Sequence, residues 1–88
     1  MTDSIRTYIV TGAAGGIGGA TAERLLKTGA NVVGTDISQR RLDALAERSS
    51  HLPGKLATIR ADITGEAAAK GVVEMALDTY GDLHGVAN

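Results

Sequence analysis

Apolar and polar positions follow two different periods along this chain of 88 residues. Short apolar runs rich in β-branched residues are typical of buried strands, whereas apolar residues that recur every three or four positions are typical of helices. The strand pattern and the helix pattern alternate along the whole chain. Strands are predicted at 5–10, 31–35, 55–60 and 83–87, and helices at 16–28, from Ser38 onward, and from Thr64 to about Tyr80.

Each predicted helix carries one apolar face and ends at a recognisable signal. Gly29 and Gly81 are suited to stop the first and third helices, because glycine readily adopts the left-handed conformation that follows a helix. A turn at 51–54 follows the second helix. The predicted buried faces are Ile17, Ala20, Thr21 and Leu25; Leu42, Leu45 and Ala46; and Ala69, Val72, Val73, Ala76 and Tyr80.

Alternating strands and helices of this length indicate parallel strands joined by right-handed crossovers. The sequence therefore predicts an α/β fold, a partial Rossmann-type parallel sheet with flanking helices and the strand order 3-2-1-4. Residues 1–88 form one partial domain in this prediction. Its fourth strand is an uncovered edge, which favours pairing with another chain. We therefore expect a fragment, or a chain that needs a partner, and self-association is one form of such pairing.

Composition excludes several classes of protein. The chain has no cysteine, and its two histidines have no neighbouring ligand, so we expect no disulfide and no metal site. A net charge of −1 without a basic block gives no support for a nucleic-acid partner. No apolar run approaches the roughly 20 residues that span a bilayer, and no secretory signal is apparent, so we expect a cytoplasmic protein without a membrane partner.

Five glycines crowd the segment after the first predicted strand, at positions 12, 15, 16, 18 and 19. We expect Gly12 to make the tight turn, Gly16 to bring the backbone near a diphosphate, and Gly18 to let the helix pack close to the sheet. The free N–H groups and positive dipole end of the helix then favour phosphate. A plain flexible turn is the alternative, but it needs only one or two glycines. A Walker-type loop is disfavoured, because no Gly-Lys-Ser/Thr follows.

Asp36 ends the second predicted strand, about twenty residues beyond the glycine segment. A carboxylate there can accept hydrogen bonds from both adenosine ribose hydroxyls and repel the 2′-phosphate of NADP. The alternative is an acid that favours the dipole of the next helix. Arg40 and Arg41 could reach a 2′-phosphate, but both lie inside the helix and the residue after the acid, Ile37, is apolar. The sequence thus favours NAD over NADP.

A second aspartate, Asp62, follows the third predicted strand. It could accept a hydrogen bond from the adenine amino group while Ile63 packs near the ring. The alternative is a cap for the third helix, a role that Thr64 could equally fill.

These residues resemble the N-terminal part of a classical short-chain dehydrogenase/reductase. Positions 11–18 match the family's Thr-Gly-x-x-x-Gly-x-Gly motif, and residues 83–88 resemble the run into its Asn-Asn-Ala-Gly motif, with Asn88 as the first or second Asn. Asp36 matches the acidic strand end of NAD-preferring members, and Asp62 matches the aspartate that contacts adenine. The cofactor-binding residues that the motifs and the resemblance indicate are Thr11, Gly12, Ala14, Gly15, Gly16, Ile17, Gly18, Asp36, Ile37, Ala61, Asp62, Ile63 and Asn88.

The resemblance implies a parent oxidoreductase that transfers hydride between a nicotinamide and an alcohol or carbonyl substrate. The family's catalytic residues are a Ser and a Tyr-x-x-x-Lys pair, and the sequence has no Tyr-x-x-x-Lys. We therefore assign no catalytic residue and expect the isolated chain to be inactive. The alternative function, from another class, is a stand-alone module that binds nucleotide or assembles with a partner without chemistry.

Overall fold

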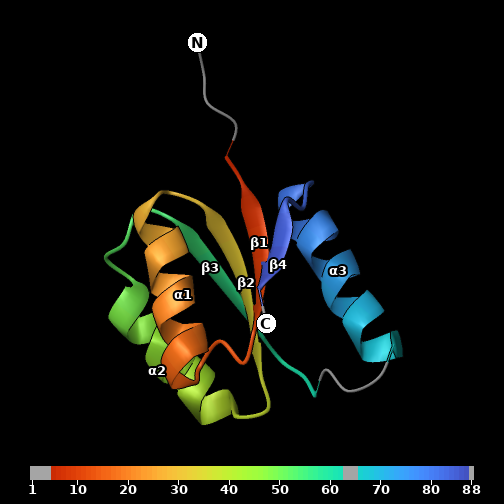
Figure 1. Cartoon of the computed structure of the whole chain (residues 1–88), viewed down its shortest axis with the longest axis horizontal. Helices are drawn as coiled ribbons and strands as arrows, with labels where there is room; N and C mark the ends of the chain where they lie inside the picture. The colour runs from red at the N-terminus through yellow and green to blue at the C-terminus, as the bar shows by residue number, and fades with distance from the viewer. Residues whose placement is uncertain (1–4, 63–65, 88) are drawn as a thin grey trace.

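The computed structural model describes residues 5–62 and 66–87 (Figure 1). Strands and helices alternate along the chain, and their bounds differ from the predicted ones by a residue or two. The elements are β1 (Thr7–Thr11), α1 (Gly16–Lys27), β2 (Asn31–Asp36), α2 (Gln39–Ser49), β3 (Lys55–Arg60), α3 (Glu66–Tyr80) and β4 (Gly85–Ala87).

The four strands form one parallel sheet in the order β3-β2-β1-β4, which confirms the predicted fold class and topology. The register pairs Thr11 with Thr35 and Asp36 with Arg60. The carboxyl ends of β1, β2 and β3 therefore meet at one edge of the sheet. That edge is where parallel sheets of this kind bind their ligands.

Helices cover both faces of the sheet, with α1 and α2 on one side and α3 on the other (Figure 1). Successive strand residues face opposite sides, so the adjacent pairs Ile9–Val10 and Val32–Val33 each serve both layers. The core beneath α1 and α2 contains Val10, Ala13, Ala22, Leu26, Val32, Leu42 and Leu45. The core beneath α3 contains Ile9, Val33, Val72 and Ala76.

The buried face of α1 agrees with the predicted one only in part. Gly19, Ala22 and Leu26 are buried, Thr21 and Leu25 are half-buried, with Leu25 packed against the core, and Ile17 and Ala20 are exposed. The prediction was wrong for Ile17 and Ala20 because hydrophobic periodicity gives no weight to glycine. Here a glycine lies on the buried face because it lets the helix backbone come close to its neighbours.

The start of α2 follows the prediction, and its buried stripe follows it in part. The Ser38 hydroxyl caps the helix by accepting a backbone N–H of the first turn. Leu42 and Leu45 are fully buried as predicted, but Ala46 is exposed and Ser49 is buried in its place. The contact with the sheet thus runs along a single narrow stripe, with the spacing i, i+3, i+7.

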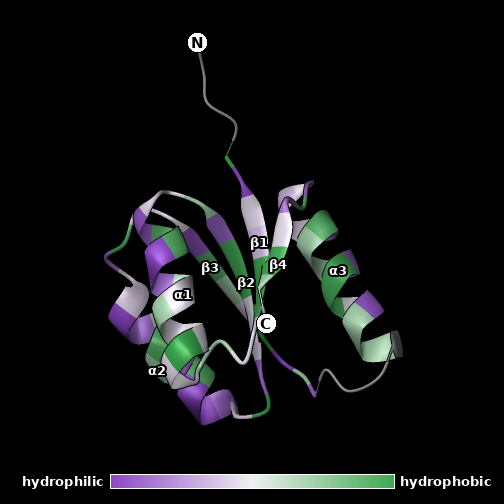
Figure 2. Cartoon of the chain, viewed as in Figure 1, coloured by the Kyte–Doolittle hydropathy of each residue, from purple (hydrophilic) through white to green (hydrophobic). Residues whose placement is uncertain are grey.

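The third helix is more hydrophobic than α2, whose surface is largely hydrophilic (Figure 2). Val72 and Ala76 pack against the sheet, and Gly81, with a φ of 77°, follows the last turn. The predicted cap Thr64 lies outside the described residues. None of the helices in 5–62 and 66–87 has the length and apolarity needed to cross a membrane.

Candidate functional site

A tight turn connects β1 to α1 and places the helix start above the carboxyl edge of the sheet. Gly12 has a φ of 62°, a left-handed conformation that favours glycine. The N–H of Gly15 donates to the Gly12 carbonyl at 3.0 Å and closes the turn. The N–H of Ala13 donates to the Thr35 carbonyl at 2.9 Å, which ties the turn to β2.

The glycines of the turn differ in the space around them. A Cβ on Gly18 would lie 2.0 Å from the Gly12 carbonyl oxygen, so α1 can begin against the turn only because this residue lacks a side chain. A Cβ on Gly16 would meet nothing within 4 Å. The predicted packing role of Gly18 is thus evident in the geometry, and Gly16 faces open space at the helix start.

The N–H groups of the turn divide into two sets. Those of Ala13 and Gly15 donate to backbone carbonyls, and that of Ala14 donates to a carboxylate, so the protein already uses them. Within the described part of the chain, the N–H groups of residues 16–18 have no acceptor. They lie at the positive end of the α1 dipole. Among these groups, the N–H groups that could bind an anion without losing a hydrogen bond to the protein are therefore those at the helix start.

Asp36 ends β2 directly beside this helix start. Its Oδ2 accepts the N–H of Ala14 at 3.2 Å, and its Oδ1 accepts the N–H of Ser38 at 3.0 Å. The carboxylate therefore links the glycine turn to the beginning of α2. Each carboxylate oxygen can accept a further hydrogen bond, so the two backbone N–H groups orient the carboxylate and leave acceptor capacity for a ligand. Sequence reasoning missed this link, because it joins residues 22 positions apart.

A cavity of about 300 Å³ opens at this edge of the sheet. Five of its lining residues belong to the predicted site, and two, Thr35 and Arg41, do not. From sequence, Arg41 was weighed as a cation that could reach a 2′-phosphate and was set aside because it lies inside the helix, since sequence position alone does not show which way a helical side chain leans. The lining consists of Thr11, Gly12, Thr35, Asp36, Ile37, Arg41 and Ala61.

The loop after β2 is held in place from β3. Arg60 Nε donates to the Ile37 carbonyl at 3.0 Å, and the Ala61 N–H donates to the Asp36 carbonyl at 3.0 Å. Asp62 is exposed and does not line the cavity. The predicted contacts of Ile63 and Asn88 fall outside the described residues.

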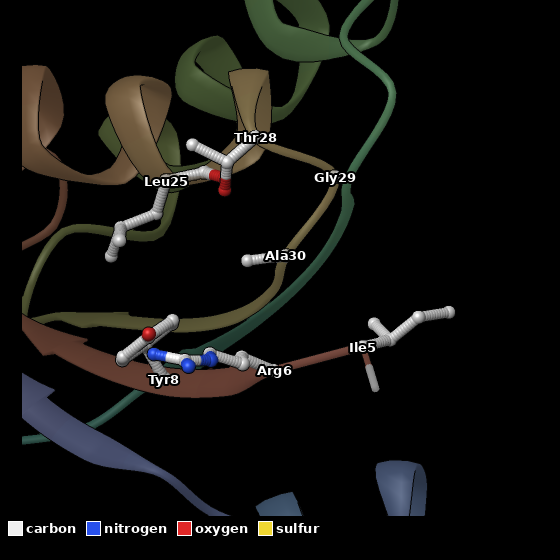
Figure 3. Close-up of a pocket in the computed structure, with 7 residues that line it drawn as sticks. All are labelled: Ile5, Arg6, Tyr8, Leu25, Thr28, Gly29 and Ala30. Atoms are coloured by element: carbon white, nitrogen blue, oxygen red, sulfur yellow. The ribbon is translucent and has the colours of Figure 1, made fainter. Parts of the chain in front are cut away.

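A larger cavity, of about 540 Å³, lies at the opposite end of the sheet (Figure 3). Its lining comes from the start of β1 and from the segment that ends α1, and it offers one guanidinium and one phenol but no carboxylate. It contains no part of the glycine turn, so its size does not make it the better candidate. The lining residues are Ile5, Arg6, Tyr8, Leu25, Thr28, Gly29 and Ala30.

Comparison with known proteins identifies the family of this chain. A family model described as short chain dehydrogenase matches residues 6–88. The 2,5-dichloro-2,5-cyclohexadiene-1,4-diol dehydrogenase of Sphingobium indicum is 42% identical over 89 residues, which cover 100% of this chain and 34% of that protein. The chain spans about a third of the length of the curated relatives that it matches.

Solved structures share the fold. A short-chain type dehydrogenase/reductase from Mycobacterium ulcerans matches with a TM-score of 0.87 at 32% identity, over 92% of this chain and 30% of that chain. A short chain dehydrogenase/reductase from Burkholderia phymatum, solved in complex with NAD, matches with a TM-score of 0.87 at 23% identity, over 93% and 29% of the two chains. With the family model matching almost the whole sequence, this chain belongs to the short chain dehydrogenase family.

Proposed function

We propose that this chain forms the NAD-binding part of an oxidoreductase that transfers hydride between the nicotinamide and an alcohol or carbonyl substrate. The observation that carries the proposal is the meeting of the β1–α1 turn and Asp36 at the carboxyl edge of the sheet, where Gly12 and Asp36 line one cavity and the Ala14 N–H donates to the carboxylate. Unpaired helix N–H groups beside a carboxylate suit a ligand with both phosphates and sugar hydroxyls. Family membership and the NAD complex of the Burkholderia phymatum relative support the same function.

The residues at the helix start fit a diphosphate. The N–H groups of Gly16, Ile17 and Gly18 are the donors that the described protein leaves unused. The space beside Gly16 is open, so a phosphate can approach the backbone there. Ile17 is 84% exposed at the same position, and its side chain is therefore free to cover the bound group. An exposed isoleucine otherwise contributes little to a fold.

Asp36 fits the adenosine ribose. Its two oxygens are oriented by backbone N–H groups on both sides, and the remaining lone pairs can accept the ribose hydroxyls. Its negative charge disfavours a 2′-phosphate and so favours NAD over NADP.

The apolar side chains of the cavity fit an adenine ring. Ile37 is 66% exposed and lines the cavity together with Ala61, so both can lose contact with water when a ring binds. We assign Asp62, just beyond β3, as the acceptor for the adenine amino group. Contacts of Ile63 and Asn88 stay predictions from the family resemblance.

Bound NAD would supply the hydride chemistry, and the residues of this chain would hold and orient it. The 88 residues contain no Tyr-x-x-x-Lys, so we assign binding and no catalytic step to them and expect no turnover by the chain alone. The substrate is proposed only as an alcohol or carbonyl compound. A cytoplasmic location and self-association stay predictions of the sequence.

Calorimetric titration with NAD tests the proposal through two matched glycine-to-alanine variants. Both Gly16 and Gly71 lie in helices with nothing within 4 Å of an added Cβ, so both variants should fold at least as well as the wild type. A methyl group at Gly16 would occupy the space proposed for the diphosphate, whereas Gly71 lies on α3. We expect Gly16→Ala to weaken the affinity for NAD about tenfold or more, and Gly71→Ala to leave this affinity unchanged.

The other outcomes are equally informative. Equal affinity of the two variants for NAD would contradict the assigned diphosphate position. A folded, monodisperse wild-type chain that binds neither NAD nor AMP would contradict nucleotide binding and favour an assembly module instead.

A further inference from the structure

We infer that His84 makes the attachment of β4 to β1 sensitive to pH: the neutral imidazole accepts a hydrogen bond from β1, and the protonated imidazole cannot. β4 is the short strand at one edge of the sheet, and it lies beside β1 (Figure 1). The inference does not depend on cofactor binding, because it concerns the end of β1 opposite the cavity at the carboxyl edge.

The imidazole of His84 lies between a donor and an acceptor. Its Nδ1 accepts the backbone N–H of Thr7 at 3.0 Å, and its Nε2 lies 3.4 Å from Oδ2 of Asp82. An N–H group needs a lone pair opposite it, whereas a carboxylate favours an N–H group. Both contacts therefore require the same neutral tautomer, with the proton on Nε2 and the lone pair on Nδ1.

The N–H of Thr7 depends on this acceptor, because Thr7 is only 1% exposed. The other polar groups of Thr7 have partners of their own. Its carbonyl accepts the His84 N–H at 2.7 Å, and its hydroxyl accepts the side-chain amide of Asn31 at 3.3 Å. A buried N–H that loses its acceptor destabilises the arrangement that buries it, so loss of the lone pair on Nδ1 favours release of this end of β4.

Protonation of His84 removes that lone pair. Both nitrogens of an imidazolium carry hydrogen, so Nδ1 becomes a donor that faces the Thr7 N–H. Two donors cannot bond to each other, and the two nitrogens must move apart from their separation of 3.0 Å. Histidine is the side chain that ordinarily changes charge between pH 5 and 8. Because 30% of the His84 side chain is exposed, solvent protons can reach the ring.

The carboxylate of Asp82 does not reverse this effect. It attracts the imidazolium, but Asp82 lies two residues before His84 in the same loop, so this attraction can persist whether β4 is attached or released. The hydrogen bond from Thr7 exists only when β4 is attached and only when the imidazole is neutral. Lowering the pH therefore removes an interaction that is specific to the attached strand, and the attachment weakens.

The neighbouring ionisable groups do not change charge in the same range. On β1, the flanking residues are Arg6 and Tyr8, and side chains of these types ordinarily titrate well above pH 8. On the last turn of α3, burial raises the pKa of Tyr80, so its phenol stays protonated, and carboxylates such as that of Asp78 ordinarily titrate below pH 5. Among the described residues at this end of the sheet, the group that switches is therefore His84.

NMR on the 88-residue chain tests each step. Long-range ¹H–¹⁵N spectra report which ring nitrogen carries the proton. Hydrogen exchange gives the protection factor of the Thr7 amide, corrected for the intrinsic pH dependence of exchange, with the amide of Val33 in the interior strand β2 as the reference. Both are measured from about pH 8 to about pH 5 for the wild type and for His84→Asn, Asp82→Asn and His51→Asn. Circular dichroism checks that each variant is folded.

In the wild type, we expect His84 Nδ1 to be unprotonated at the upper pH. The protection of Thr7 relative to Val33 should fall about fivefold or more as the ring becomes protonated. His84→Asn should abolish this fall, because the side-chain carbonyl of asparagine takes the place of Nδ1 as acceptor and does not titrate.

Asp82→Asn should move the fall in Thr7 protection to lower pH. The asparagine can still accept the Leu83 N–H, which Asp82 Oδ1 accepts at 2.9 Å, but it no longer attracts the imidazolium. His51→Asn is the matched control, because His51 is exposed in the turn before β3, and it should keep the wild-type profile. A profile that does not move in Asp82→Asn contradicts the part assigned to that carboxylate.

Three results overturn the inference. The first is a wild-type ring that carries its proton on Nδ1 at the upper pH. The second is constant protection of Thr7 while the ring signals of His84 show that it becomes protonated. These two measurements need no variant. The third is an equal fall of protection in His84→Asn, which would mean that another group controls the strand.

Discussion

At the residue scale, the glycines of the β1–α1 turn serve different physical purposes. Gly12 adopts a left-handed φ, Gly18 removes a side chain that would strike the Gly12 carbonyl, and Gly16 leaves space open. Substitutions at Gly18 and Gly16 should therefore separate damage to the fold from damage to binding.

Gly18→Ala should lower the free energy of unfolding by about 1–3 kcal/mol or more, because its Cβ would lie 2.0 Å from a backbone oxygen that cannot move freely. Gly16→Ala should not lower the free energy of unfolding and should raise it by up to about 1 kcal/mol, because alanine has a higher helix propensity than glycine. Urea unfolding followed by circular dichroism measures both changes. Equal stability of the two variants would show that the turn relaxes around a methyl group at position 18.

Asp36 combines a structural role with the proposed recognition role. Asp36→Ala leaves the N–H groups of Ala14 and Ser38 without their acceptor, which should cost about 1–2 kcal/mol of unfolding free energy. The same variant should bind NAD more weakly than the wild type does, and its preference for NAD over NADP should be smaller. Urea unfolding and titration with both cofactors measure the two effects.

Asp43, a carboxylate on the exposed surface of α2, gives the charge-matched control. Asp43→Ala should preserve the ratio of NAD to NADP affinity. An unchanged ratio in Asp36→Ala would show that the carboxylate does not select the cofactor.

At the element scale, the short edge strand β4 is joined to β1 by a side chain as well as by the sheet ladder. The Thr7 N–H donates to His84 Nδ1 at 3.0 Å, and the His84 N–H donates to the Thr7 carbonyl at 2.7 Å. His84 therefore extends the β1–β4 pairing one step beyond the three residues of β4.

His84→Ala should remove the acceptor of the Thr7 N–H and cost about 1–2 kcal/mol. The Thr7 amide should then exchange with deuterium faster, which NMR measures directly. His51→Ala is the matched control, since His51 is exposed in the turn before β3 and should leave the Thr7 amide unaffected. Unaltered protection in His84→Ala would mean that the ladder alone holds β4.

At the scale of the whole molecule, burial of a phenol links stability to alkaline pH. Desolvation by burial raises the pKa of Tyr80, on α3, above its ordinary value of 10.0. The protonated phenol is thus favoured in the folded state. The contribution of this phenol to the free energy of unfolding is fully present below pH 10. It is lost as the pH rises through the higher pKa of the folded state.

Wild-type stability should therefore fall more steeply above pH 10 than that of Tyr80→Phe, which has no phenol to ionise. Urea unfolding between pH 8 and 11 measures the difference between the two proteins. Identical slopes in wild type and Tyr80→Phe would contradict the role of Tyr80.

The pattern of the sequence was sufficient for the order of the elements, the parallel sheet and the family. These depend on local information: β-branched runs, helical periodicity, and glycines placed directly after a strand. The same local signals located the capping role of Ser38 and the edge of the sheet to which Asp36 belongs.

Only the tertiary structure decided which atoms of the site are already in use and which side chains share a cavity. Ala14 and Asp36 meet because two parallel strands end at the same edge, and Arg41 joins them because α2 starts there. The buried face of α1 was mispredicted in part for the same reason: a glycine becomes buried through the approach of distant backbone, which no local periodicity records. Local sequence sets the conformations that each segment favours, whereas contacts between distant segments depend on how those segments pack.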